Sequence, residues 1–148
     1  MKQLLFAAAC LISTTMGFAQ GWVHNGAHVV ANNGTFIVID GTKGNYKAQS
    51  VSRLIFNGDV EISFTGNWIN NSSGAIFMTN DGKAILKGAI QSFQGTAITA
   101  FPALDLKCSA NPTLQTNILV GGGHKGGGTG KINLFDRQLN LNGKKLII

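Results

Sequence analysis

The stretch Asp59-Val60-Glu61-Ile62-Ser63-Phe64 decides the fold class of this chain. Apolar side chains occupy every second position in it, and polar side chains occupy the positions between them. This period of two is typical of a β-strand with one face toward a core and the other toward water. The same alternation recurs in Leu104-Asp105-Leu106-Lys107, Ile132-Asn133-Leu134 and Leu139-Asn140-Leu141. The chain is therefore predicted to be built from short strands.

Two further segments, residues 35–39 and 74–78, are apolar almost throughout. Such runs are typical of strands buried on both sides, so we expect both segments to be covered on both faces. No stretch shows a convincing helical pattern. The composition agrees, because 20 glycines and only 12% charged residues accompany 44% hydrophobic ones. Helical proteins rarely have this composition, and we predict an all-β protein.

Turn dipeptides separate the strands. Each pairs Asn or Asp with Gly and supplies the positive φ that a tight turn requires, so the strands between them must be short. The dipeptides are Asn25-Gly26, Asn33-Gly34, Asp40-Gly41, Asn57-Gly58, Asp81-Gly82 and Asn142-Gly143.

Short strands at fairly regular spacing fit a sandwich, a barrel or a solenoid. Glycine-rich turns, asparagines that could form ladders at coil corners, and recurring phrases favour the solenoid. Residues 56–62 and 141–147 are one such related pair. We predict a right-handed parallel β-helix of about five or six coils, each of roughly twenty or more residues. A β-sandwich is the alternative.

Residues 1–19 are predicted to be a cleavable signal peptide. Lys2 precedes an apolar run, Leu4 to Ile12, and small residues lead to a cleavage site after Ala19. The run is shorter than the roughly twenty residues that span a bilayer, so we expect no transmembrane segment after signal cleavage. Residues 20–148 are predicted to form one β-solenoid domain, secreted or held at the cell surface.

The chain is basic, and loss of Lys2 lowers its formal net charge from +6 to +5. A basic surface attracts nucleic-acid phosphate. The lysines, however, are spread along the chain and do not form a stripe with interleaved aromatic residues. We therefore predict no nucleic-acid partner, and name acidic glycans or other cell-surface polymers as candidate partners.

The glycine-rich residues 121–131 do not fit a phosphate-binding loop. Lys125 stands where that pattern needs its first glycine, and Ile132 where it needs Ser or Thr. We interpret the segment as a surface loop and predict no cofactor.

Two histidines, His24 and His28, are four residues apart, as in a helical zinc motif. Asn25-Gly26 between them opposes a helix, and the Glu base of zinc proteases is missing. We expect an irregular N-terminal segment here and predict no metal site; His124 is a lone loop residue.

Asp59 and Glu61 share one face of a strand and are the best candidates for paired catalytic carboxylates. The chain has only six acidic residues, so a solvated outer face is the favoured interpretation. We predict no catalytic residue and no enzyme activity.

Three further residues are candidates for a defined role. Trp22 and Trp68 are speculative ligand-binding residues, because an aromatic face complements the apolar face of a sugar ring. Trp68 is expected to be mainly structural. Cys108 is left alone once Cys10 departs with the signal, and alternation places it with Leu104 and Leu106, so we expect it to be buried.

Five phrases resemble the N-terminal part of large repetitive adhesin-like surface proteins of Gram-negative bacteria, often cargo of the type IX secretion system. They are residues 66–71 (GNWINN), 82–88 (GKAILKG), 90–95 (IQSFQG), 101–106 (FPALDL) and 139–143 (LNLNG). The resemblance covers residues 54–148 and implies successive rungs of a β-helical stalk. Lys87 departs from the family pattern, which usually has an uncharged residue there, and we expect no C-terminal sorting domain within residues 54–148.

The predicted function is that of a non-enzymatic, exported structural or adhesin-like segment associated with the cell outer membrane. The alternatives are a fragment of a β-helical polysaccharide lyase or hydrolase, and a carbohydrate-binding module. The apolar end Lys145-Leu146-Ile147-Ile148 leads us to expect that the solenoid is truncated, with further rungs or domains of a longer chain as its partners.

Overall fold

The computed structural model describes residues 21–41, 44–73, 82–89, 91–121 and 130–148. Within these residues the chain contains β-strands and no helix, as predicted. The strands are β1 (Gly21–Asn25), β2 (His28–Asn32), β3 (Phe36–Ile39), β4 (Asn45–Ser50), β5 (Arg53–Asn57), β6 (Glu61–Phe64), β7 (Trp68–Ser72), β8 (Lys83–Leu86), β9 (Ser92–Gly95), β10 (Thr99–Phe101), β11 (Ala103–Leu106), β12 (Thr113–Leu114), β13 (Ile118–Val120), β14 (Lys131–Asn133) and β15 (Leu146–Ile147).

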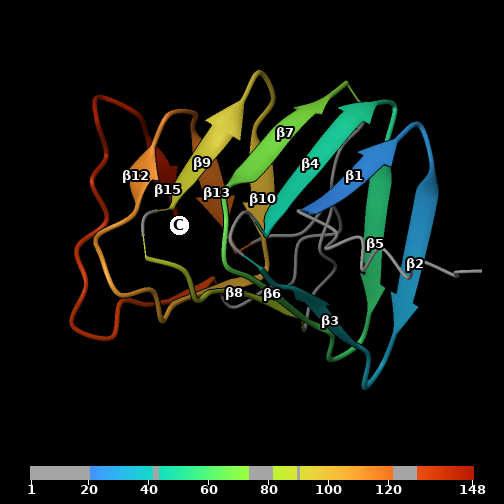
Figure 1. Cartoon of the computed structure of the whole chain (residues 1–148), viewed down its shortest axis with the longest axis horizontal. Helices are drawn as coiled ribbons and strands as arrows, with labels where there is room; N and C mark the ends of the chain where they lie inside the picture. The colour runs from blue at the N-terminus through green and yellow to red at the C-terminus, as the bar shows by residue number, and fades with distance from the viewer. Residues whose placement is uncertain (1–20, 42–43, 74–81, 90, 122–129) are drawn as a thin grey trace, which may run out of the picture.

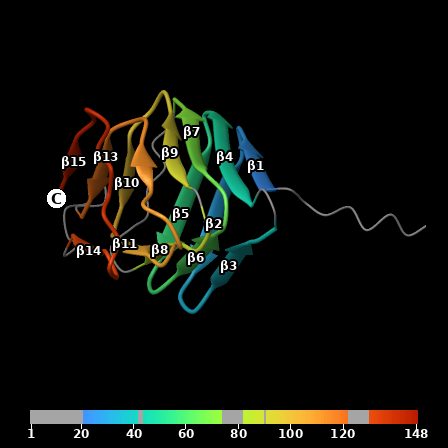
Figure 2. The same cartoon turned by 60° about the vertical axis from the view of Figure 1, so that its left-hand side comes forward.

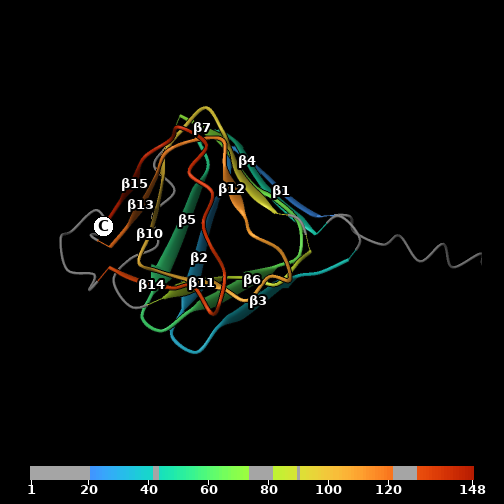
Figure 3. The ribbon, with the colours of Figure 1, turned by 90° about the vertical axis from the view of Figure 1, so that its left-hand side faces the viewer.

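The strands stack in parallel as a β-solenoid of about four turns. One sheet has the order β1-β4-β7-β9-β12, and a second has the order β14-β11-β8-β6-β3. The third side consists of β2-β5 and β10-β13-β15. Figure 1 and Figure 2 show the coils following one another along the long axis, and Figure 3 shows three sides around a central core.

The winding is right-handed. Seen from the end near β15, the chain runs anticlockwise through β1, β2 and β3 as it approaches the viewer (Figure 3). The predicted parallel β-helix is confirmed, and the sandwich is excluded. Two of the sheets contain five strands each, one from every coil, in agreement with the five or six coils predicted. Each coil consists of strands and the corners between them, and register partners in neighbouring coils are 19 to 28 positions apart in the sequence.

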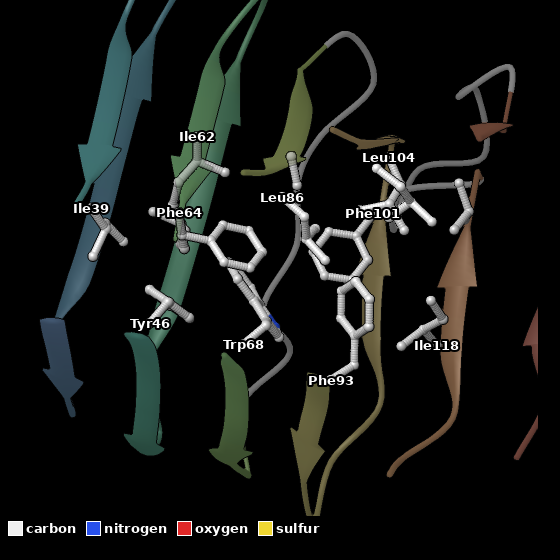
Figure 4. Close-up of a cluster of buried hydrophobic side chains, with 14 of the residues drawn as sticks. Ile39, Tyr46, Ile62, Phe64, Trp68, Leu86, Phe93, Phe101, Leu104 and Ile118 are labelled. Atoms are coloured by element: carbon white, nitrogen blue, oxygen red, sulfur yellow. The ribbon is translucent and has the colours of Figure 1, made fainter. Parts of the chain in front are cut away.

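Aromatic rings stacked along the axis form the centre of the core (Figure 4). Trp22, Tyr46, Trp68 and Phe93 are register partners in successive coils of the first sheet. The Tyr46 and Trp68 rings lie 4.0 Å apart between centroids and nearly parallel, at 21°. Phe101, from the third side, packs edge-on against Trp68, with 5.1 Å between the ring centroids. Stacked and edge-to-face pairs of this kind stabilise a core beyond the burial of their area.

Asparagine side chains connect the corners of neighbouring coils. Asn45 Oδ1 accepts a hydrogen bond from the backbone N–H of Asn67 at 2.6 Å. Asn67 Oδ1 in turn accepts from the backbone N–H of Ser92, at 2.9 Å, and from its hydroxyl, at 3.0 Å. The same bond joins Asn33 to Asp59, Asn71 to Thr96, Asn111 to Gln138 and Asn117 to Lys145. The predicted asparagine ladders are confirmed.

Glycine allows the coils to approach closely at one of these corners. Gly95 has a φ of 114°, and a Cβ built on it would overlap the backbone carbonyl of Asn70 in the coil before. Any other residue there would strain the backbone and push the two coils apart.

The prediction for residues 35–39 is wrong. Ile37 and Ile39 of β3 face the core, but Phe36 is 72% and Val38 is 68% exposed. Strand β3 lies in the first coil at the edge of its sheet, and no described element covers its outer face. Residues 74–78 fall outside the described part of the chain.

Candidate site at the N-terminal end of the solenoid

The end of the solenoid formed by β1, β2 and β3 contains a pocket of about 670 Å³. Its apolar wall consists of inward-facing side chains of the first coil, among them Trp22, Val29 and Ile37. Asn32, Thr35 and Asp40 add polar groups to the lining. Its volume is typical of small-molecule sites, which combine an apolar wall with a few polar groups. The described structure thus leaves one end of its core accessible.

Trp22 lines two depressions at this end. Besides the pocket, it borders a groove of about 300 Å³ on the outer side of the first sheet, together with Val23, Lys47 and Ile69. Its ring stacks on His24, with centroids 5.8 Å apart and planes at 25°, and meets Tyr46 edge-on at 5.4 Å. Trp22 is partly buried and held in place by aromatic contacts, and its role as a ligand-binding residue stays a prediction.

Trp68 lies in the interior, two coils further along the same column. It is completely buried, and its Nε1–H donates a hydrogen bond to Thr99 Oγ1 at 2.9 Å. The Asn70 side chain donates to the same oxygen at 3.1 Å. Trp68 therefore presents no face to a ligand in this structure, and its expected structural role is confirmed.

His24 is almost fully enclosed at this end, with 2% of its surface exposed. Its Nδ1 shares a hydrogen bond with the Tyr46 hydroxyl at 3.2 Å, whereas Nε2 is buried without a hydrogen-bond partner among the described residues. Burial lowers the pKa of His24 and raises the pKa of Tyr46. Desolvation penalises the charged form of both groups, so both are held neutral.

The two histidines do not converge. His28 is exposed on β2, in register with Arg53, while His24 points into the core. The expectation of an irregular segment is wrong, because β1 pairs with β4 over five residues. Strand β1 is regular because Trp22 and His24 point inward and contact Tyr46 of β4. No group of three or more potential metal ligands occurs within the described residues.

The carboxylates noted in the sequence lie on the outer surface. Glu61 Oε1 forms an ion pair with Lys83 Nζ at 3.2 Å, between register partners of adjacent coils. Both side chains are partly exposed, and Asp59 is exposed at the preceding corner. The solvated outer face is therefore where the structure places both acidic groups.

Cys108 is buried, as predicted, and burial raises the pKa of its thiol. A buried thiol of raised pKa has little thiolate and low reactivity. Most of the glycine-rich segment, residues 122–129 with His124 and Lys125, lies outside the described residues.

The sequence did not reveal the contact between His24 and Tyr46 or the pocket. Both arise from residues in different parts of a coil or in different coils. The recurrence of Trp22, Tyr46, Trp68 and Phe93 at similar spacings was the available signal for the aromatic column.

No protein-family model, no curated protein and no solved structure matches this chain. Among the described residues there is also no helix long and apolar enough to cross a membrane. The geometry of the solenoid is therefore the only observation that bears on its function.

Proposed function

We propose that this chain is a non-enzymatic, exported segment of a cell-surface protein, serving as a stalk or adhesive surface at the cell outer membrane. The observation that carries the proposal is the unbroken parallel stack of coils, from β1 to β12 on one side and from β3 to β14 on another. Each coil is tied to the next by backbone ladders and by corner asparagines. A solenoid of this kind makes a long, self-supporting rod, because each coil needs only its neighbours.

The outer surface of the inner coils suits contact with polymers. Lys47, Gln49 and Asn71 project from the first sheet, and their amide and ammonium groups can hydrogen-bond with hydroxylated or acidic chains. The excess of positive charge adds a long-range attraction to acidic glycans.

Localisation tests the export step. The full chain, expressed in a Gram-negative host, should lose residues 1–19 and become accessible to protease added outside the cell. A matched chain without residues 2–19 should remain inside. Retention of the full chain in the cytoplasm, with its leader intact, would contradict the proposal.

A second candidate, carbohydrate binding, is favoured by the position of Trp22 beside the pocket and the outer groove. Calorimetry with oligosaccharides selected on a glycan array should show binding that is lost in Trp22→Ala and largely kept in Trp22→Phe. Val51→Ala, at an exposed site in the second coil, is the control. Equal binding by Trp22→Ala and the unchanged chain would exclude the site.

A turnover assay with polysaccharides distinguishes the enzymatic alternative from the structural proposal. Release of reducing ends or unsaturated products from any polysaccharide by the purified chain would replace the structural proposal with a lyase or hydrolase.

A further inference from the structure

The first coil is apolar on its outer surface as well as on its inner one. Four outward side chains, each more than half exposed, belong to it: Val23 on β1, Val30 on β2, and Phe36 and Val38 on β3. Their register partners in the second coil are mainly polar, since Phe36 is followed by Glu61 and Val38 by Ser63. The apolar surface is therefore a property of the first coil, not of a whole side of the solenoid.

Strand β3 carries the two most exposed apolar side chains of the first coil, Phe36 and Val38. It is the outermost strand of its five-stranded sheet, and among the described residues no strand pairs with its free edge. Its inward residues Ile37 and Ile39 line the pocket, and its outward residues Phe36 and Val38 are exposed. An edge strand that is apolar on both faces is a template for another strand.

The chemistry of this edge selects a polypeptide as its partner. Hydrocarbon would cover Phe36 and Val38, but it cannot satisfy the backbone N–H and C=O groups along the free edge of β3. A sugar offers hydrogen bonds but little apolar surface. Only an added β-strand supplies both backbone hydrogen bonds and apolar side chains on two faces.

We propose that the partner strand is β3 of a second copy, so that two chains associate end to end about a two-fold axis with their β3 strands antiparallel. A strand with apolar residues on both faces is complementary to itself in this arrangement. Phe36 and Val38 of one copy lie against Phe36 and Val38 of the other. Ile37 and Ile39 of both copies cover the mouths of the two pockets.

The charge distribution permits this contact. Described residues 21–41 contain a single formally charged side chain, Asp40, which directly follows β3. In the antiparallel pair the two Asp40 carboxylates lie at opposite ends of the joined strands, so they do not meet. The chain as a whole is strongly basic, so the nearly neutral first coil is a favourable surface for self-association. This inference goes beyond the stalk proposal and does not depend on an adhesive function.

The test is the mass of the chain in solution, measured by light scattering across a range of concentrations. The protein is purified after expression with its leader, and its N-terminus is determined by mass spectrometry. The mass should rise from one chain to two as concentration increases. Phe36→Lys should weaken the association by about tenfold or more, because it places a charge at the centre of the contact. Phe36→Leu should retain it.

Ile98→Lys is the matched control. Ile98 is similarly exposed, but it precedes β10, far from the first coil. Circular dichroism verifies folding, and Val38→Lys replaces Phe36→Lys if that variant does not fold. A chain that is monomeric at every concentration, assemblies larger than two, or equal loss of association in Phe36→Lys and Ile98→Lys would overturn the proposal.

Discussion

The first coil and the third coil place the same residue type at the same position with opposite results. Trp22 and Trp68 both point inward and both lie in register with Tyr46. Trp68 has a coil on each side and is completely buried, whereas Trp22 has Tyr46 on one side only and lines an open pocket. Burial in a solenoid therefore depends on the neighbouring coils as much as on the residue, which is the behaviour of a nearly one-dimensional fold.

The largest effect is expected when the buried member of this pair is truncated. Trp68→Ala removes a ring packed between Tyr46, Phe64 and Phe101, and it removes the hydrogen bond that Trp68 donates to Thr99. The free energy of unfolding should fall by about 3–5 kcal/mol, measured by urea denaturation. Trp22→Ala should cost clearly less, since its site is partly open. Equal costs would show that coil position does not matter.

An intermediate effect is expected where two coils touch through glycine. Gly95→Ala sets a side chain against the Asn70 carbonyl at a φ of 114°, and should lower the free energy of unfolding by about 2 kcal/mol. Gly26→Ala, at a φ of 70° in the first coil, has no atom within 4 Å of the new Cβ. That control should lose only about 1 kcal/mol. A smaller loss for Gly95→Ala than for Gly26→Ala would contradict the close approach of the coils.

The smallest effect is a loss of stability of the first coil at acidic pH. The pKa of folded His24 lies below its ordinary value of 6.5 because burial penalises the cation. At a pH between the pKa of His24 in the folded chain and its pKa of 6.5 in the unfolded chain, the unfolded chain binds more protons. The free energy of unfolding is therefore highest above pH 6.5 and declines as the pH falls below that value. Hydrogen exchange of β1 amides should accelerate at pH 5.5 relative to pH 7.5, after correction for intrinsic exchange.

Two variants sharpen that measurement. His24→Gln should remove the pH dependence of β1 opening, whereas His28→Gln, which alters an exposed side chain, should keep it. Amides of β7, in the third coil, should show the same protection at both pH values. An identical acid response in β1 of His24→Gln would assign the effect to another group.

Local patterns predicted part of the strands and corners, but residues 139–141, expected to alternate as a strand, form only an isolated bridge at Asn140 and leave Leu141 exposed. Alternation in residues 59–64 placed Ile62 and Phe64 inside, and Asn-Gly dipeptides marked turns such as Asn142-Gly143, where both residues have positive φ. These features depend on neighbours in the sequence, which is why they could be read from it.

The remaining features depend on neighbours in space. The apolar run of β3 indicated a strand but not whether anything covers its outer face. Unequal coil lengths, with register partners 19 to 28 positions apart, concealed an exact repeat in the sequence. The contact between His24 and Tyr46 follows only once the register of β1 on β4 is known. For the same reason, the sequence did not distinguish Trp22 from Trp68 as a ligand-binding candidate, because only the stacking of the coils buries Trp68 and leaves Trp22 beside the pocket.

The asparagine bonds at the corners all have the same direction. In each pair named above, the oxygen belongs to the earlier coil and the amide hydrogen to the later one. A finished coil thus displays a row of vacant acceptors before its successor exists. If the chain emerges from a membrane pore N-terminus first, every new segment meets a surface that already specifies its register. A chain that folded from its N-terminus would then add its coils in order, each on a surface that already specifies the register of the next.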